Sequence, residues 1–368
     1  MSAAERLASA PDVSQTAPAA ARAVPRATAG PAGREQPPRG LTTKQWLSRW
    51  LARRAGAVAA GLPLRVGYWC ADRAGDVFYR FSPGYRGNVV ANLQHVLGQD
   101  ADLAALRALA RTTFRYSARN FYDLLRLPRL STEAIDATVR LIGSWQPVDA
   151  ALARGKGVIF VTGHLGAFDV AGQLIPLHGY RCVLVTVRTV SEFVHEAVTY
   201  LRASKGFALE EATPGGLRRL MRALRQGQTI GLASDRDFLR NGVPVTFFGE
   251  ETTLPPGAVR LALETGAAIV VLICRRHDRA HTLLLEEPFW LAKTGDLAAD
   301  MQRGLRRIAE QLEHHIRATP EQWVMFQRVW PATPPPAIAV FPVGSPLEGR
   351  VLGGEASSLA AEPKPPPP

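Results

Sequence analysis

The chain has 368 residues, of which 46% are apolar, and a formal net charge of +12 at pH 7. This length supplies a core for one large domain or two modest ones, and a charged fraction of 21% excludes disorder for most of the chain. The three cysteines lie far apart and lack metal-ligand spacing, which excludes a disulfide scaffold and a zinc ribbon and fits a reducing compartment.

Prolines concentrate at the two ends of the chain. Residues 1–40 hold 6 of the 28 prolines and residues 331–368 hold 11. We therefore expect a disordered leader over 1–40 and a Pro-rich disordered tail over 331–368. The leader shows no secretory signal pattern.

Residues 41–130 form a basic region that reads as helical throughout. They hold 14 Lys and Arg against 5 Asp and Glu, whereas residues 131–330 hold 23 against 21. Breaks are expected at Pro63, at Pro83–Gly84 and at Pro128. A local basic surface attracts polyanions, either nucleic acid or an anionic lipid surface.

The first helix of this region, within Leu41–Leu64, carries Trp46 and Trp50 at helical spacing, interleaved with basic side chains. Trp and Arg together suit the headgroup region of a bilayer. The apolar run reaches only about ten residues, against the roughly 20 that span a membrane. The pattern predicts a helix that lies on a membrane; the alternative is an ordinary helix that docks its Trp residues on the core.

A second basic helix is expected over Leu103–Leu127. Four arginines recur every four residues and form one stripe: Arg107, Arg111, Arg115 and Arg119. The stripe is either a polyanion-binding surface or simply a solvated face.

From about residue 131 the pattern changes to short β-rich runs that alternate with helical ones. Expected strands cover 157–162, 182–187, 229–234, 268–274 and 281–286. Expected helices cover 168–177, 191–205, 215–226, 256–265 and 301–318. This alternation predicts an α/β core over 131–330, with a sheet flanked by helices.

The most informative stretch follows the first of these strands. His164 lies at the turn after the buried strand, and Asp169 falls near the first turn of the next helix. Carboxyl ends of strands are where α/β sheets build sites. A carboxylate that holds an imidazole fixes its tautomer and stabilises the imidazolium, which predicts a catalytic pair. The alternative is a helix-capping Asp169 beside a surface His164.

Nothing in the sequence supplies a nucleophile to complete a triad. There is no GxSxG elbow and no cysteine in a telling position near a His. The His–Asp pair therefore suggests a base that acts directly on a substrate hydroxyl, without a covalent enzyme intermediate.

Two further groups are candidates for substrate binding. Asp235, Arg236 and Asp237 follow the strand 229–234, and Arg202 lies on the helix 191–205. They could orient a polar acceptor or bind an anion; the alternatives are a salt-bridged turn and a solvated helix arginine. The remaining histidines share no metal-ligand spacing, so no metal is expected.

Four motifs in this order resemble the bacterial lipid A biosynthesis (late) acyltransferase superfamily. They are GKGVIFVTGHLGAFDVAGQLI (155–175), YLRASKGFAL (200–209), ASDRDFLRNGVPVTFFGE (233–250) and PEQWVMFQRVW (320–330). Within this superfamily, the chain resembles the phosphatidylinositol mannoside acyltransferases more closely. The likeness lies chiefly in the stretches SDRDF and VTFFGE and in an Asp, rather than a Glu, at position 169, five residues after His164. The likeness covers about 45–330.

The resemblance implies a glycerolipid-acyltransferase-like fold and a membrane-associated enzyme. Such an enzyme moves an acyl chain from acyl-CoA or acyl carrier protein, as co-substrate, to a hydroxyl of a lysophospholipid or glycolipid. It implies His164 as general base with Asp169 as its orienting partner. Arg202 matches an arginine of the active-site groove, and Asp235, Arg236 and Asp237 match a polar turn near the acceptor.

These observations lead to an O-acyltransferase bound peripherally at the cytoplasmic face of the plasma membrane, with lipid partners, no nucleic acid and no resident cofactor. Two alternatives remain open. One is a thioesterase that uses the same pair to activate water. The other is a non-catalytic protein that binds a membrane or nucleic acid, against which the near-neutral balance of residues 131–330 argues.

Overall fold

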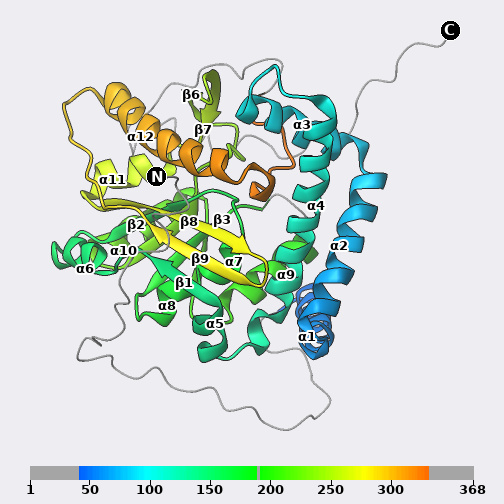
Figure 1. Cartoon of the computed structure of the whole chain (residues 1–368). Helices are drawn as coiled ribbons and strands as arrows, with labels where there is room; N and C mark the ends of the chain where they lie inside the picture. Colours follow the sequence, from blue (N-terminus) through cyan, green and yellow to red (C-terminus); the bar gives the residue numbers. More distant parts are fainter. Residues whose placement is uncertain (1–40, 189–190, 331–368) are drawn as a thin grey trace. The chain divides into compact units, whose positions relative to one another are not determined.

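The computed structural model describes residues 41–188 and 191–330. The leader and tail expected over 1–40 and 331–368 lie outside the described residues. Within the described part, helices surround a central sheet (Figure 1), so the predicted α/β class with a mixed sheet flanked by helices is confirmed.

Four helices make up the basic region, and they end where its prolines predict. Pro63 precedes the second helix, Pro83 begins the third, and Pro128 lies in the 3₁₀ turn Leu127–Arg129 after the fourth. Side chains of Thr42 and Asp102 cap the first and fourth helices by accepting from backbone N–H groups. The helices are α1 (Thr43–Gly61), α2 (Leu64–Phe81), α3 (Pro83–Leu97) and α4 (Leu103–Arg126).

Seven strands form the central sheet in the order β1-β9-β8-β2-β5-β3-β4. Every neighbouring pair is parallel except β8 with β9. The strands are β1 (Val139–Ile142), β2 (Val158–Thr162), β3 (Cys182–Thr186), β4 (Ala208–Glu211), β5 (Thr229–Ala233), β8 (Ala268–His277) and β9 (Ala280–Leu285). The five strands expected from the sequence are all present, and β1 and β4 join them at the two edges.

Several helices cover this sheet. They are α5 (Thr132–Thr138), α6 (Gln146–Ala153), α7 (Phe168–Ala171), α8 (Leu174–Leu177), α9 (Glu192–Ala203), α10 (Pro214–Arg225), α11 (Gly257–Thr265) and α12 (Leu297–Ala318). The helix expected over 168–177 is divided into α7 and α8. Pro176 has no backbone N–H, so α8 cannot continue the hydrogen-bond ladder of α7 across Gly172.

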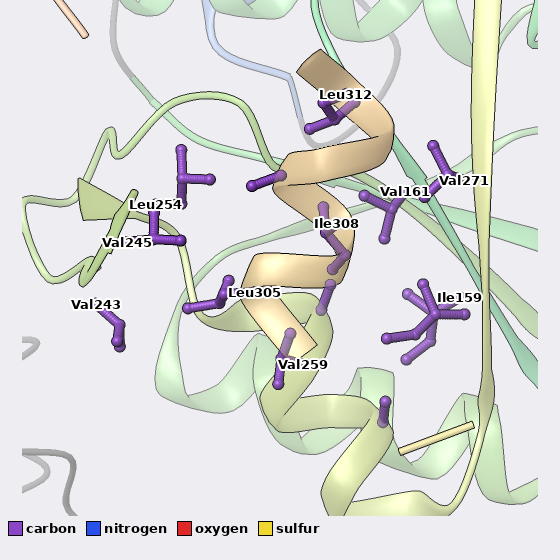
Figure 2. Packing of buried hydrophobic residues seen from close by; sticks show 14 of the residues in the cluster. Ile159, Val161, Val243, Val245, Leu254, Val259, Val271, Leu305, Ile308 and Leu312 are labelled. Atoms are coloured by element: carbon purple, nitrogen blue, oxygen red, sulfur yellow. The ribbon is translucent and has the colours of Figure 1, made fainter. Parts of the chain in front are cut away.

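Alternating strand residues separate two layers of core. Ile159 and Val161 of β2 face α10, α11 and α12, whereas Val158 and Phe160 face α6 to α9. Figure 2 shows α12 between the sheet and a hairpin of β6 (Val243–Phe247) and β7 (Glu250–Leu254), which the sequence analysis did not anticipate. Leu305, Ile308 and Leu312 of α12 are buried between the sheet and this hairpin.

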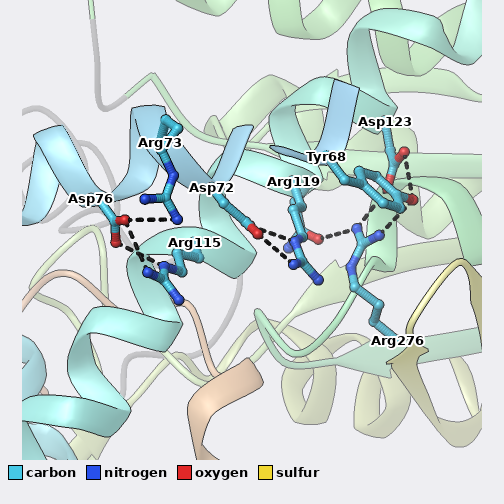
Figure 3. Close-up of polar contacts among 9 residues, drawn as sticks. Tyr68, Asp72, Arg73, Asp76, Arg115, Arg119, Asp123 and Arg276 are labelled. Atoms are coloured by element: carbon cyan, nitrogen blue, oxygen red, sulfur yellow. Dashed lines mark hydrogen bonds and ion pairs between the residues drawn. The ribbon is translucent and has the colours of Figure 1, made fainter. Parts of the chain in front are cut away.

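The arginine stripe of α4 is neither a free polyanion-binding surface nor a purely solvated face. Asp72 and Asp76 of the adjacent helix α2 accept from it. Arg119 forms two hydrogen bonds to Asp72, at 2.6 and 2.7 Å, and Arg115 forms two to Asp76, at 2.7 and 2.9 Å (Figure 3). Arg111, Arg115 and Arg119 therefore join two helices, whereas Arg107 is exposed and its side chain has no hydrogen bond or ion pair to a described residue.

A buried polar cluster connects these helices to the sheet. Arg276 of β8 is almost fully buried and donates to Asp123 and Asn120 of α4, at 2.6 and 2.8 Å. Tyr68 of α2 accepts from Arg276 and donates to Asp123 (Figure 3). Burial, with the charge of Asp123, raises the pKa of Tyr68 to about 12, so it stays a neutral donor. The buried charges are thus paired and hydrogen-bonded.

Among the described residues, none of the helices combines the length and the apolar character that crossing a bilayer requires.

Candidate active site

The site lies at the carboxyl ends of β2 and β5, which are parallel neighbours. Thr162 pairs with Ala233 at the end of this ladder. His164 and Asp235 each lie two residues beyond that pair, so the two strands deliver them to the same height of the sheet edge.

His164 and Asp235 form two contacts. Nδ1 of His164 lies 2.8 Å from Oδ1 of Asp235, and the backbone N–H of His164 donates to Oδ2 at 2.7 Å. The indole N–H of Trp323 also donates to Oδ2, at 2.9 Å. Because a carboxylate only accepts, Nδ1 carries the proton and Nε2 is left as the basic nitrogen.

The environment keeps Asp235 ionised. Its side chain is fully buried, and burial by itself raises a carboxyl pKa. The charge and the hydrogen bonds of His164, together with the indole of Trp323, outweigh burial and lower the pKa of Asp235. The imidazole of His164 keeps 22% of its surface exposed, so the pair has a buried anion and an accessible base.

The direct pairing of His164 with Asp169 that the sequence predicted is corrected by this geometry. Asp169, on the first turn of α7, receives Nε of Arg202 at 2.6 Å and Nη2 at 3.3 Å. Asp235 takes the position beside Nδ1 instead, because a residue at the same height on the neighbouring strand faces His164. Asp169, five residues on, has turned with α7 towards α9.

Asp169 and Arg202 nevertheless belong to the same site. The Arg202 guanidinium lies 5.8 Å from the centroid of the Phe168 ring, and that ring makes an edge contact with the His164 imidazole, with 5.5 Å between ring centroids. Arg202 is thus ion-paired with a carboxylate and is linked to the imidazole of His164 through the aromatic ring of Phe168.

The turn that carries His164 is clamped from two sides. Gly166 has a φ of +60° and a Cβ there would come within 2.3 Å of the Cys274 carbonyl oxygen, so only glycine fits without a shift. Asn120 of α4 donates to the Gly166 carbonyl at 2.7 Å, and the Gly166 N–H donates to the carbonyl of Gln322 at 3.0 Å. Val324 N–H in turn donates to the His164 carbonyl.

Asp237 does not present a free carboxylate to His164 and Asp235. It accepts from the backbone N–H groups of Asn241 and Gly242 and from the hydroxyl of Thr253. Asp237 therefore braces the loop before β6, whereas the sequence predicted a contact with substrate. Arg236 lies between the two aspartates, with its guanidinium 3.6 Å from the centroid of the Phe238 ring.

The sequence analysis missed Trp323 and Asn120 as site residues and assigned Asp235 to substrate. Trp323 and Asn120 come from segments far from His164 in the chain. One available signal was that Asp235 follows a strand as directly as His164 does. Trp323 also lies within one of the four family-like motifs, PEQWVMFQRVW (320–330).

The arrangement is suited to general-base chemistry. An exposed imidazole, with its tautomer set by a buried carboxylate, can take a proton from a hydroxyl or from water. Among residues 41–188 and 191–330, no group of three or more His, Cys, Asp or Glu side chains has the placement to hold a metal ion.

Comparison of the sequence with known proteins assigns the chain to a family. The model of the bacterial lipid A biosynthesis acyltransferases matches residues 35–331. A phosphatidylinositol mannoside acyltransferase of Mycobacterium tuberculosis is 32% identical over 245 residues, covering 65% of this chain and 75% of the relative.

Two further relatives agree. A phosphatidylinositol mannoside acyltransferase of Mycolicibacterium smegmatis is 29% identical over 247 residues, covering 65% of this chain and 77% of the relative. A lipid A biosynthesis acyltransferase of Haemophilus influenzae is 23% identical over 178 residues, covering 48% of this chain and 54% of the relative. The resemblance seen in the four motifs is confirmed, and the chain belongs to the bacterial lipid A biosynthesis acyltransferase family.

Proposed function

We propose that this acyltransferase moves a fatty acyl chain from a thioester, either acyl-CoA or acyl carrier protein, to a hydroxyl of a lysophospholipid or glycolipid. The observation that carries the mechanism is the contact of His164 Nδ1 with the buried carboxylate of Asp235. It leaves Nε2 as a base for an acceptor hydroxyl, without a covalent acyl-enzyme.

In this mechanism the acceptor hydroxyl gives its proton to Nε2 of His164 while its oxygen attacks the thioester carbonyl. Asp235 stabilises the imidazolium that forms. The tetrahedral intermediate collapses, the C–S bond breaks, and the proton passes from His164 to the thiolate. The products are an ester and a free thiol. Water must be excluded, because an activated water would hydrolyse the thioester.

The relatives favour a glycolipid as the acceptor. Those from the two mycobacterial species are named for phosphatidylinositol mannoside. We therefore take a mannosylated phosphoinositide as the first acceptor to test.

We further propose that the enzyme associates peripherally with an anionic membrane at its cytoplasmic face, chiefly through the outer face of α2 and not, as expected from the sequence, through Trp46 and Trp50 of α1, which are half-buried. This surface is a stripe with a spacing of four residues, made of Arg65, Trp69, Arg73, Val77 and Phe81. Trp69 and Phe81 are 62% and 75% exposed. Aromatic and basic side chains on one helix face suit the headgroup region, and α1 supplies Leu47, Leu51 and Val58 as further exposed apolar side chains.

Transfer is tested by mass spectrometry of purified protein with palmitoyl-CoA and a mannosylated phosphoinositide in detergent micelles. We expect the acceptor to gain one palmitoyl chain with wild type and with His314→Ala, whose histidine lies on an exposed part of α12. His164→Ala should form no product above background. If free palmitate accumulates without acylated lipid, the thioesterase reading replaces the transferase. If His164→Ala is active, the mechanism is wrong.

Membrane association is tested by sedimentation with vesicles that contain anionic phosphatidylglycerol. Trp69→Ala combined with Phe81→Ala should weaken binding at least about 100-fold, since each aromatic ring removed costs about 1.5–3 kcal/mol of burial. Trp290→Ala is the matched control, because Trp290 is also exposed but packs against Arg154. Equal binding by both variants would remove α2 as the docking element.

A further inference from the structure

Arg236 stands apart from the other arginines that are buried or half-buried near the site. Arg276 and Arg202 each donate to an aspartate, and so does Arg119 at the α2–α4 interface. The guanidinium of Arg236 has neither an ion pair nor a hydrogen bond to any described residue. Its Nε is buried without a partner, as is that of Arg276, but the terminal nitrogens of Arg276 are hydrogen-bonded and those of Arg236 are not.

The unpaired guanidinium of Arg236 lies close to His164. Arg236 directly follows Asp235, at the same carboxyl edge of the sheet as His164. Its guanidinium stacks on Phe238 at 3.6 Å from the ring centroid, and the Phe238 and His164 ring centroids are 6.1 Å apart. Phe238 thus contacts both the cation and the catalytic imidazole. The positive charge of Arg236 therefore lies near the imidazole of His164 but is separated from it by the ring of Phe238.

The neighbouring carboxylates are already engaged and do not neutralise Arg236. Asp235 accepts from His164 and Trp323, and Asp237 accepts from the loop it braces. Burial lowers the pKa of Arg236 to about 10, and the charge of Asp235 offsets this only in part. The side chain is therefore still a cation at neutral pH.

A partly desolvated cation without a hydrogen-bond acceptor is unfavourable, and stacking on a ring recovers only part of the lost hydration. Stability alone does not explain such a group. A guanidinium presents a planar fork of donors that matches two oxygens of a phosphate. Neither the acyl chain nor the hydroxyl of the proposed reaction carries charge, but the donor carries the phosphate groups of CoA or of phosphopantetheine, and a phosphoinositide acceptor carries a phosphodiester.

We propose that Arg236 is a phosphate-binding residue of this site, which holds a phosphate group of a substrate beside the ring of Phe238 while the reacting hydroxyl and thioester meet at His164. This inference rests on the proposed function for the identity of the two substrates. The phosphate group belongs either to the phosphopantetheine part of the donor or to the headgroup of the acceptor.

The test is calorimetric titration of the full chain in neutral detergent micelles with palmitoyl-CoA and, separately, with phosphatidylinositol. Arg236→Gln removes the charge, Arg236→Lys keeps it without the fork, and Arg240→Gln is the matched control, since Arg240 is exposed in the same loop. We expect Arg236→Gln to weaken binding of one probe by about 10- to 100-fold, because a hydrogen bond to a charged group contributes about 1.5–3 kcal/mol. Arg236→Lys should lose less, and Arg240→Gln should match wild type.

The pattern of losses identifies the source of the phosphate. A loss confined to palmitoyl-CoA assigns Arg236 to the donor, and a loss confined to phosphatidylinositol assigns it to the acceptor. The proposal is overturned if wild type binds neither probe, if Arg236→Gln binds both as wild type does, or if Arg240→Gln loses as much. A wild type that binds a probe but transfers no palmitoyl would reject the proposed function while leaving the phosphate site standing.

Discussion

The α2–α4 interface and the carboxyl edge of the sheet are built from the same residue types, arginine and aspartate, but match them differently. Between the helices, Asp72 and Asp76 are each met by guanidinium groups, and the stripe of α4 has its anions in register. At the sheet edge, Asp235 is met by an imidazole and an indole, and the adjacent Arg236 has no acceptor among the described residues.

This difference separates scaffold from site. Pairing with Asp72 and Asp76 holds two helices in one arrangement and engages Arg111, Arg115 and Arg119 with aspartates of the same protein. Incomplete pairing at the sheet edge leaves a base with an accessible nitrogen and a cation with free donors, both of which a substrate can satisfy. Departures from full polar satisfaction are expected where function is located.

The largest expected effect is on catalysis, and it distinguishes the two carboxylates at the sheet edge, Asp235 and Asp169. Asp235→Asn should lower kcat by about 10²- to 10⁴-fold, since the amide no longer fixes the His164 tautomer or stabilises the imidazolium. Asp169→Asn should cost less, because Asp169 holds Arg202 and does not hold the imidazole. Steady-state transfer kinetics measure both variants. An equal or larger loss from Asp169→Asn would restore the pairing predicted from sequence.

A second prediction concerns stability on the helical side. Arg276→Met should lower the free energy of unfolding by about 3 kcal/mol, because the buried carboxylate of Asp123 loses its closest cation and keeps only the 3.7 Å ion pair with Arg126 and the hydroxyl of Tyr68. Arg115→Gln, which breaks a more exposed pair with Asp76, should cost less than about 1 kcal/mol. Urea unfolding measures the two differences. If the two variants lose similar amounts of stability, burial does not make the ion pair of Arg276 more important than that of Arg115.

A third prediction is a pH dependence of stability next to the same cluster. Burial and the charge of Arg276 lower the pKa of His281, on β9, to about 3. The unfolded chain, whose histidine pKa is near 6.5, then binds a proton that the folded protein rejects. Stability from this residue is full above pH 6.5 and is lost as the pH falls towards 3, at up to about 1.4 kcal/mol per pH unit.

Unfolding of His281→Gln across this pH window checks the prediction. The variant should show a flatter decline than wild type between pH 6.5 and 4.5, because its amide does not titrate. His314→Gln, with an exposed histidine, should keep the wild-type slope. If both variants retain that slope, another group accounts for the acid sensitivity.

Local chemistry carried most of the fold prediction. Prolines predicted the breaks between α1, α2, α3 and α4, and alternating apolar runs predicted five strands of the sheet. The motif order identified the family, and the position of His164 after a buried strand indicated the sheet edge at which the candidate site lies. Each of these signals lies within a short window of sequence, where backbone sterics and side-chain periodicity act.

The partner of His164 was decided by strand order. Two carboxylates, Asp169 and Asp235, were available in the sequence, and the nearer one in the chain was the natural choice. Because β5 is the parallel neighbour of β2, Asp235 reaches Nδ1 across the sheet, while α7 turns Asp169 towards Arg202. The sequence by itself determined which residues could do chemistry. Only the tertiary structure decided which of them are paired, because hydrogen bonds depend on distances between strands and helices that residue spacing does not encode.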